Sequence, residues 1–447
     1  MDTSIIGPVT VMKSFTEQFG EQSPIVHGIL VSSILLCAAF GSLFAGRLAD
    51  RLGRPQAIGL GASVFTIGAI LEAAALNISM FAVGRAIEGI GYGLYFSTQT
   101  VYICEISPPK ARGPLTSGPQ FMTCLALVAG YFISYATVNI QGSLSWRLPF
   151  IIMTGMAVVY VLSNLFLLPQ SPRWLIRNKD YGAAEKVWDA LEVLHEDREI
   201  ESNESTAEEG ITATMQQSSL PDQNPKPHAS FRSLWEREVR KRTFLAVFLL
   251  GFLQLCGIDA VLYPGSSPKK LLSWSVISLK PICIHPKKNR DAENPNQASG
   301  VSAIVIVASS VPATLFADKW GRRTSTLMGG VGLTALMILM GGLYAGDAVL
   351  PDRGAGRWVV IVSIYLYCIV QATTWGISIK VWAPEIQPQH TRAQAISLAY
   401  GSNWVCNFFV AFVCPILLEK SAPSAYFLFG GCTAVATISK RSKRGFQ

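Results

Sequence analysis

The stretch Asp50-Arg51-Leu52-Gly53-Arg54 recurs later in this 447-residue chain as Asp318-Lys319-Trp320-Gly321-Arg322-Arg323. Each copy lies at the end of one apolar run, and another apolar run follows at once. Charged side chains are costly beside lipid, so their return at equivalent helix ends indicates a membrane protein made of two related halves.

A second charged pattern accompanies each copy of the first. Glu105-Ile106-Ser107-Pro108 is followed by Arg112, and Glu385-Ile386-Gln387-Pro388 is followed by Arg392. The step from glutamate to arginine is seven residues in both places. Two patterns that repeat in the same order favour an internal duplication.

The composition agrees with residence in a bilayer. Half of the residues (50%) are hydrophobic and only 15% are charged, whereas about a quarter are charged in ordinary soluble domains. The net charge is +8, but the basic residues cluster between apolar runs, as the positive-inside rule requires. We therefore expect a lipid bilayer, and no nucleic acid, as the partner of this chain.

The sequence shows no sign of enzyme chemistry. Its nine cysteines are scattered, mostly within apolar runs, and none has zinc-site or redox-motif spacing. We find no glycine-rich phosphate loop, metal-ligand cluster or catalytic triad. We expect neither an enzyme nor a bound cofactor.

The apolar runs predict an all-α membrane protein. A bilayer core needs about 20 apolar residues per helix. Two partial runs, 3–16 and 425–438, flank the full-length runs. The ten full-length runs are 25–46, 56–76, 80–104, 114–138, 148–168, 243–263, 299–317, 324–344, 357–382 and 393–418. The prediction is nominally twelve transmembrane helices in two six-helix halves, with the first and last helices shortened.

The same runs divide the chain. The positive-inside rule places the connector and the loops that carry the repeated motifs in the cytoplasm. Residues 181–196 of the connector have helical periodicity, and its polar middle is expected to be disordered. The predicted parts are an N-terminal half (1–168), a connector (169–242), a C-terminal half (243–438) with an atypical Pro- and Lys-rich insert (264–298), and a basic tail (439–447).

The repeated charges predict a cytoplasmic gate. Complementary charges at neighbouring helix ends would latch the two halves while a central cavity faces outward. The alternative is that they act as topology determinants and loop caps. The predicted gate residues are Asp50, Arg54, Glu105 and Arg112 in the first half, and Asp318, Arg322, Glu385 and Arg392 in the second.

Further motifs connect the chain to a known family. They include Pro169-Gln170-Ser171-Pro172-Arg173 after the sixth span, Gly84-Arg85, and Asn403-Trp404. With the repeated charged motifs, they resemble the sugar porter family of the major facilitator superfamily, and most of all its fungal members. The resemblance implies an alternating-access transporter with a polar site between its halves.

The resemblance also implies which residues contact sugar. Amides both donate and accept hydrogen bonds, and aromatic faces pack on sugar rings; the alternative for each amide is a hydrogen bond between helices. Lys380 stands where the family often has a sugar-stacking tryptophan, so it would contact an acidic sugar or pair with a carboxylate. The alternative is a lysine at a loop end, if the span ends early. The predicted substrate-binding residues are Gln120, Gln254, Asp259, Trp375, Lys380, Asn403, Trp404 and Asn407.

Proton coupling is implied by a second match to the family. Asp2 matches the first-span aspartate of proton-coupled members, and Arg85 matches its fourth-span partner. A carboxylate beside an arginine can release the pair when it is protonated. The alternative for Arg85 is an anchor at the membrane interface.

These features predict a monomeric plasma-membrane sugar transporter that works as a sugar–proton symporter, driven by the proton gradient. The sugar stays open among hexoses, pentoses, disaccharides and sugar acids. One alternative is a sensor that binds sugar without transporting it. Another is an inactive product of a faulty gene model, with a late start, a translated intron at 264–298 and a wrong last exon.

Overall fold

Helices form all of the regular elements in the part of the chain that the computed structural model describes. That part comprises residues 1–108, 112–191, 193, 198, 231–236, 239–257, 296–315, 321–349, 355–388 and 390–441. The insert predicted at 264–298 lies outside it except for its last residues, which begin a helix at Asn296. The middle of the connector lies outside it as well.

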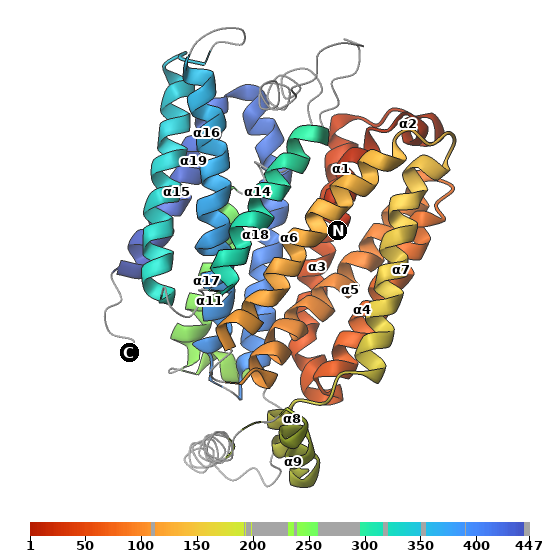
Figure 1. Cartoon of the computed structure of the whole chain (residues 1–447), viewed down its shortest axis with the longest axis vertical. Helices are drawn as coiled ribbons and strands as arrows, with labels where there is room; N and C mark the ends of the chain where they lie inside the picture. The colour runs from red at the N-terminus through yellow and green to blue at the C-terminus, as the bar shows by residue number, and fades with distance from the viewer. Residues whose placement is uncertain are drawn as a thin grey trace.

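The N-terminal half is a bundle of long helices with two short ones at its start. They are α1 (Asp2–Thr10), α2 (Lys13–Phe19), α3 (Pro24–Leu52), α4 (Arg54–Ala73), α5 (Ile78–Ile106), α6 (Arg112–Thr137) and α7 (Leu144–Phe166). The connector contributes α8 (Pro172–Arg177), α9 (Tyr181–Ala190) and the 3-10 helix η2 (Phe231–Trp235). In Figure 1, α8 and α9 lie below the bundle.

The C-terminal half repeats this plan. Its described helices are α11 (Val239–Leu255), α14 (Asn296–Leu315), α15 (Arg322–Ala345), α16 (Ala355–Thr373), α17 (Trp375–Glu385), α18 (Arg392–Lys420) and α19 (Ala422–Arg441). With α16 and α17 taken as one span, the described helices match the predicted arrangement of six spans in each half.

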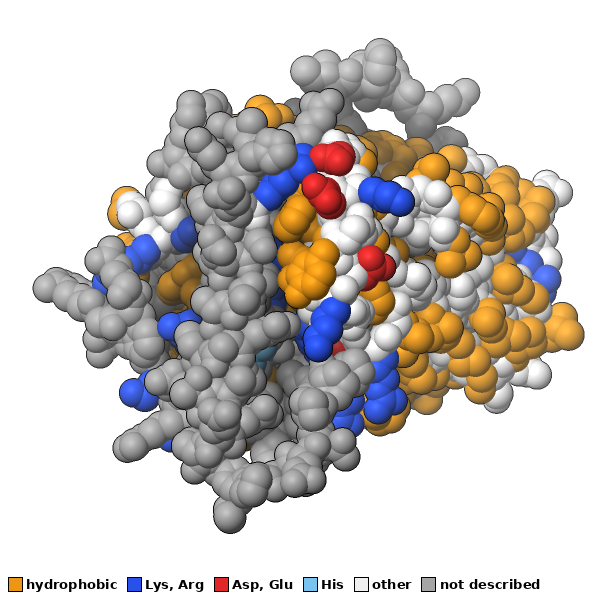
Figure 2. All heavy atoms as spheres, turned by 90° about the horizontal axis from the view of Figure 1, so that it is seen from below, with side chains coloured by type: hydrophobic (Ala, Val, Ile, Leu, Met, Phe, Trp, Pro, Cys, Tyr) orange, Lys and Arg blue, Asp and Glu red, His pale blue; other side chains and the backbone are white. Residues whose placement is uncertain are grey.

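Seven helical segments of the described chain are long and apolar enough to cross a bilayer. They are Val26–Leu52, Arg54–Ala73, Gly113–Thr137, Leu144–Phe166, Arg322–Ala345, Trp358–Glu385 and Arg392–Cys414. Large apolar side chains face outward from several of them, such as Phe166 (79% exposed) and Met328 (70% exposed). Charged side chains instead lie on the face seen from below in Figure 2, which the sequence predicts to be cytoplasmic. The chain is a multi-pass membrane protein.

Three spans differ from their predicted form. The run 3–16 is not one helix, because Met12 is extended (ψ 140°) and separates α1 from α2. The run 357–382 is interrupted at Thr374, which begins α17 with φ −118° and ψ −79°. The last run is longer than 425–438, since α19 has 20 residues.

The two halves meet along helix pairs that are far apart in the sequence. α3 packs against α18, and α6 packs against α14. Figure 1 shows α14 beside α6 at the boundary between the halves. Gly46 permits close contact on the side predicted to be cytoplasmic, because a Cβ there would lie 2.8 Å from the carbonyl oxygen of Ala393. The C-terminal part of α3 and the N-terminal part of α18 are therefore packed together.

Candidate functional site

A buried charge cluster lies within the N-terminal half. The guanidinium of Arg85 on α5 donates a 2.6 Å hydrogen bond to the carboxylate of Asp2 on α1. The same nitrogen lies 3.7 Å from Glu72 on α4 and 4.0 Å from Glu88. Another nitrogen of Arg85 donates to the carbonyl oxygen of Val31 on α3 (3.2 Å). One arginine thus connects four helices.

Close packing of α4 against α5 places the two glutamates. A Cβ on Gly84 would lie 2.8 Å from Cγ of Glu72, and a Cβ on Gly68 would collide with the backbone nitrogen of Glu88. Small residues allow such close contact between membrane helices. Arg85, Glu72 and Glu88 are consequently 0% exposed, and Asp2 is 8% exposed.

The structure brings together Asp2 and Arg85, the predicted proton-coupling pair. Glu72 and Glu88 were not among the predicted site residues. A signal for them was present, since each is an acidic residue within a predicted apolar run (56–76 and 80–104), and such residues mark functional sites in membrane helices.

A second polar contact connects the two halves. The Nζ atom of Lys380 on α17 lies 2.5 Å from Oε1 of Gln120 on α6 and donates a hydrogen bond to it. The same ammonium is 5.9 Å from the centre of the Phe96 ring on α5. The predicted substrate residues Gln120 and Lys380 therefore contact each other across the boundary between the halves.

The other predicted amides lie on α11 and α18. Gln254 donates a hydrogen bond to Asn403 (3.3 Å), which donates to the carbonyl oxygen of Leu250 (2.8 Å). These are hydrogen bonds between helices, the alternative considered for each amide. The Oδ1 atom of Asn407 is buried and accepts no hydrogen bond from the described residues, so this amide retains an acceptor for a ligand.

Aromatic side chains surround this region from both halves. The ring of Trp404 on α18 lies 4.9 Å from Tyr92 and 5.9 Å from Phe96, both on α5. The hydroxyl of Thr100 on α5 lies 3.1 Å from that of Tyr400 on α18. Tyr92, Phe96 and Tyr400 were not predicted as site residues, because an aromatic residue in an apolar run has no distinguishing signal.

Trp375 has a different position from the one its predicted role requires. Its ring is fully buried, and its indole nitrogen donates to the carbonyl oxygen of Thr326 on α15 (2.8 Å). This placement favours packing inside the C-terminal half over contact with a sugar. Asp259 lies outside the described residues.

The predicted gate charges form pairs at the cytoplasmic helix ends. Arg54 binds Glu105 with two hydrogen bonds (2.9 and 3.0 Å) and also contacts Asp50 (3.3 Å). In the C-terminal half, Arg322 pairs with Glu385 (3.2 Å). These pairs each lie within one half and join the complementary charges of neighbouring helix ends.

The described contacts connect the gate to two further segments. Asp50 also binds Arg177 of the connector (3.1 Å). Arg392 of the C-terminal half lies near enough to interact electrostatically with Glu105. Asp318 and the side chain of Arg112 lie outside the described residues. The role of these charges as a latch stays a prediction.

Comparisons with known proteins agree with this geometry. A family model described as "Sugar (and other) transporter" matches residues 2–440. The chain is 28% identical to glucose transporter GlcP of Staphylococcus epidermidis, over 93% of this chain and 84% of that protein. It is 26% identical to the probable glucose transporter rco-3 of Neurospora crassa, over 95% of this chain and 68% of that protein.

Solved structures share the fold. The proton:xylose symporter XylE, bound to 6-bromo-6-deoxy-D-glucose, aligns over 98% of this chain and 91% of its own length, with a TM-score of 0.75 and 21% identity. The fucose transporter FucP in its outward conformation aligns with a TM-score of 0.62 and 14% identity, over 100% of this chain and 98% of its own.

Proposed function

The chain belongs to the sugar transporter family of the major facilitator superfamily, and from that premise we propose that it moves a sugar together with a proton. The two halves would alternate between outward-facing and inward-facing states around a site at their boundary. We assign this activity to a monomer, since one chain supplies both halves, and we place it in the plasma membrane.

One observation carries the proton coupling: Asp2 and Arg85 form a buried ion pair with a distance of 2.6 Å. Protonation of Asp2 removes the negative charge that holds the guanidinium. Arg85 also binds the backbone of α3 through Val31. Loss of the ion pair would therefore change how α1 is held against α3 and α5, and this change couples the proton to the conformational step.

Polar and aromatic groups at the boundary support sugar binding there. Gln120 and Lys380 come from opposite halves and already contact each other. Asn407 has a buried oxygen that accepts no hydrogen bond from the described residues. Trp404 has an unpaired indole nitrogen among these residues as well. Unsatisfied buried polar groups beside aromatic rings suit a ligand that is rich in hydroxyls.

The gate charges support the alternating step. Glu105 is bound by Arg54 within its own half and interacts with Arg392 of the other half. We propose that this interaction holds the cytoplasmic ends together and weakens when the halves separate there.

The test uses purified full-length chain in liposomes with labelled glucose. An inward proton gradient should drive accumulation of glucose by the wild type. Asp2→Asn should reduce accumulation to the level of protein-free liposomes, while counterflow of labelled glucose persists, because exchange needs no net proton movement. Glu185→Gln on the exposed face of α9 is the matched control and should behave as the wild type.

Two outcomes would contradict the proposal. Full accumulation by Asp2→Asn would exclude proton coupling through this residue. Glucose binding by the wild type without any counterflow would indicate the non-transporting sensor instead.

A further inference from the structure

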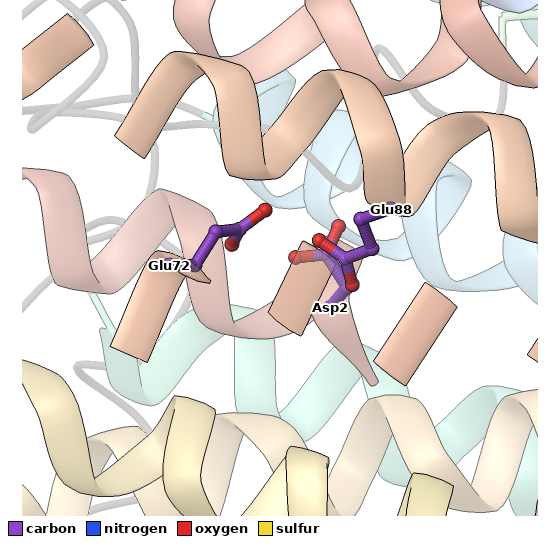
Figure 3. Close-up of side chains that lie close together, drawn as sticks. All are labelled: Asp2, Glu72 and Glu88. Atoms are coloured by element: carbon purple, nitrogen blue, oxygen red, sulfur yellow. The ribbon is translucent and has the colours of Figure 1, made fainter. Parts of the chain in front are cut away.

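Two glutamates of the buried cluster have no role in the mechanism proposed above. Glu72 and Glu88 are 0% exposed, and none of their four carboxylate oxygens accepts a hydrogen bond from the described residues. Their nearest cation is Arg85, at 3.7 and 4.0 Å, and its shortest contact is with Asp2 instead. Figure 3 shows the side chains of Asp2, Glu72 and Glu88 converging from three helices.

The charges of this cluster do not balance when every group is ionised. One oxygen from each of the three carboxylates lies within 4.8 Å of the others. For these four side chains, three negative charges against one guanidinium leave two net negative charges in an almost wholly buried volume. Buried charges are tolerated when they are paired and hydrogen-bonded, and two carboxylates that share a site cannot both ionise readily.

We propose that Glu72 and Glu88 share one proton and form a second proton-binding site beside Asp2 and Arg85. This proposal rests on the proposed symport function and extends it. The shared proton removes one negative charge, and it supplies an O–H donor to a carboxylate that otherwise accepts no hydrogen bond. A carboxyl group and a carboxylate on adjacent helices then form a charge-assisted hydrogen bond.

The geometry favours a proton over a metal ion. The guanidinium of Arg85 lies within 4.0 Å of each of the three carboxylates. A cation held by these oxygens would lie directly against that positive charge. A proton shared by Glu72 and Glu88 instead neutralises one carboxylate, so no additional cation lies next to Arg85.

Other titratable groups also face the cluster. They are the α-amino group of Met1 beside Asp2, Cys37 on α3, and Tyr95 about two turns beyond Glu88 on α5. Tyr95 and Cys37 are neutral groups when they carry their protons. Burial disfavours the charged form of the Met1 amine, and as an uncharged amine it leaves the count of charges unchanged. The two glutamates then stay the groups whose proton content changes the charge balance.

A proton that stays on Glu72 and Glu88 lets the charges of the cluster sum to zero once Asp2 is protonated. With the shared proton in place, Glu72 and Glu88 together carry one negative charge. When Asp2 takes up the transported proton, this charge balances Arg85, and the guanidinium has a second counter-ion 3.7 Å away. The cluster then alternates between one net negative charge and none.

Infrared spectroscopy of the purified full-length chain in lipid membranes tests the proposal directly. A protonated carboxyl group has a C=O stretching band that shifts in D₂O. We expect this band in the wild type, in Asp2→Asn and in the exposed control Glu185→Gln, and its loss in Glu72→Gln/Glu88→Gln. The single variants Glu72→Gln and Glu88→Gln serve as a second test if the double variant does not fold. Each should lose or displace the band.

The outcomes separate this proposal from symport. The band needs no transport, so its presence beside failed accumulation would reject symport and keep the shared proton. An unchanged band in the double variant, or no band in the wild type, would overturn the shared proton while symport through Asp2 stands. A rise in Tm on adding Na⁺ or Ca²⁺ in the wild type, absent in the double variant, would overturn it in favour of a cation site.

Discussion

At the scale of single residues, Lys380 makes a polar contact across the boundary between the halves. Its ammonium reaches from α17 to Gln120 on α6 and lies near the face of Phe96. A tryptophan at this position would offer a ring face to a sugar, whereas a lysine offers a charge-assisted donor. The sequence left three options for this side chain: an acidic sugar, a carboxylate of the protein, or a place at a loop end. Lys380 lies inside α17 and contacts Gln120, which excludes the loop end, and a substitution distinguishes the other two.

We expect Lys380→Met to reduce binding of an acidic sugar selectively. Methionine retains an apolar stem but removes the charge, and a hydrogen bond to a charged group is worth about 1.5–3 kcal/mol. Inhibition of labelled-glucose counterflow by glucuronate should therefore weaken about tenfold or more. Inhibition by unlabelled glucose should change little. Equal loss for both sugars, or for neither, would show that Lys380 pairs within the protein.

The residues that the sequence located are those with a charge in an apolar context or a family motif. Asp2 and Arg85 were assigned through the resemblance, and the structure brings them together. Glu72 and Glu88 carried the same kind of signal but had no motif beside them. The two glutamates lie beside Arg85 because Gly68 and Gly84 let α4 and α5 pack closely together. A single sequence does not show that these two glycines face each other.

At the scale of helices, the contact between α4 and α5 depends on these glycines. A methyl group at Gly84 would meet Cγ of Glu72 at 2.8 Å and its backbone nitrogen at 3.0 Å. Backbone atoms cannot move without separating the helices. Overpacking of a tight core costs about 1–3 kcal/mol, so we expect Gly84→Ala to lower the Tm of the detergent-solubilised protein.

Gly155→Ala on α7 provides the matched control. A Cβ at Gly155 meets nothing within 4 Å, and the residue is exposed within its helix. Alanine is favoured over glycine in a helix by about 1 kcal/mol, so its Tm should stay the same or rise. Equal Tm values for the two variants would show that α4 and α5 have room to relax.

Hydropathy predicted where the membrane helices lie, but it did not predict where one of them is interrupted. The run 357–382 is mostly apolar and was predicted as one span, yet Thr374 divides it into α16 and α17. The hydroxyl of Thr374 donates to the carbonyl oxygen of Val370, and a Cβ on Gly329 of α15 would collide with its side chain. Packing between helices, which hydropathy does not report, therefore sets the end of α16.

At the scale of the whole molecule, the repeated motifs predicted two halves correctly. Their complementary charges pair within each half, and their role as a latch between the halves stays a prediction. In the structure, Arg54 follows the turn at Gly53 (φ +89°) and binds Glu105 in its own half. Between the halves, α3 packs closely against α18 near these charges, where a Cβ on Gly46 would lie 2.8 Å from the carbonyl oxygen of Ala393.

This packing predicts a substitution that opens the cytoplasmic side. A leucine at Gly46 would collide with the backbone of α18, so Gly46→Leu should favour the state in which the cytoplasmic ends are apart. Spin labels carried by non-natural amino acids at Arg51 and Arg323, both exposed on opposite halves, report this distance without altering the native cysteines. Their distance distribution should shift to longer values.

Gly28→Leu separates this effect from a general effect of leucine in α3. Gly28 lies on the same helix, and a Cβ there meets nothing within 4 Å. Its distance distribution should match that of the wild type. An unchanged distribution for Gly46→Leu would contradict the prediction, because it would show that closure does not depend on the close contact of α3 with α18 at Gly46.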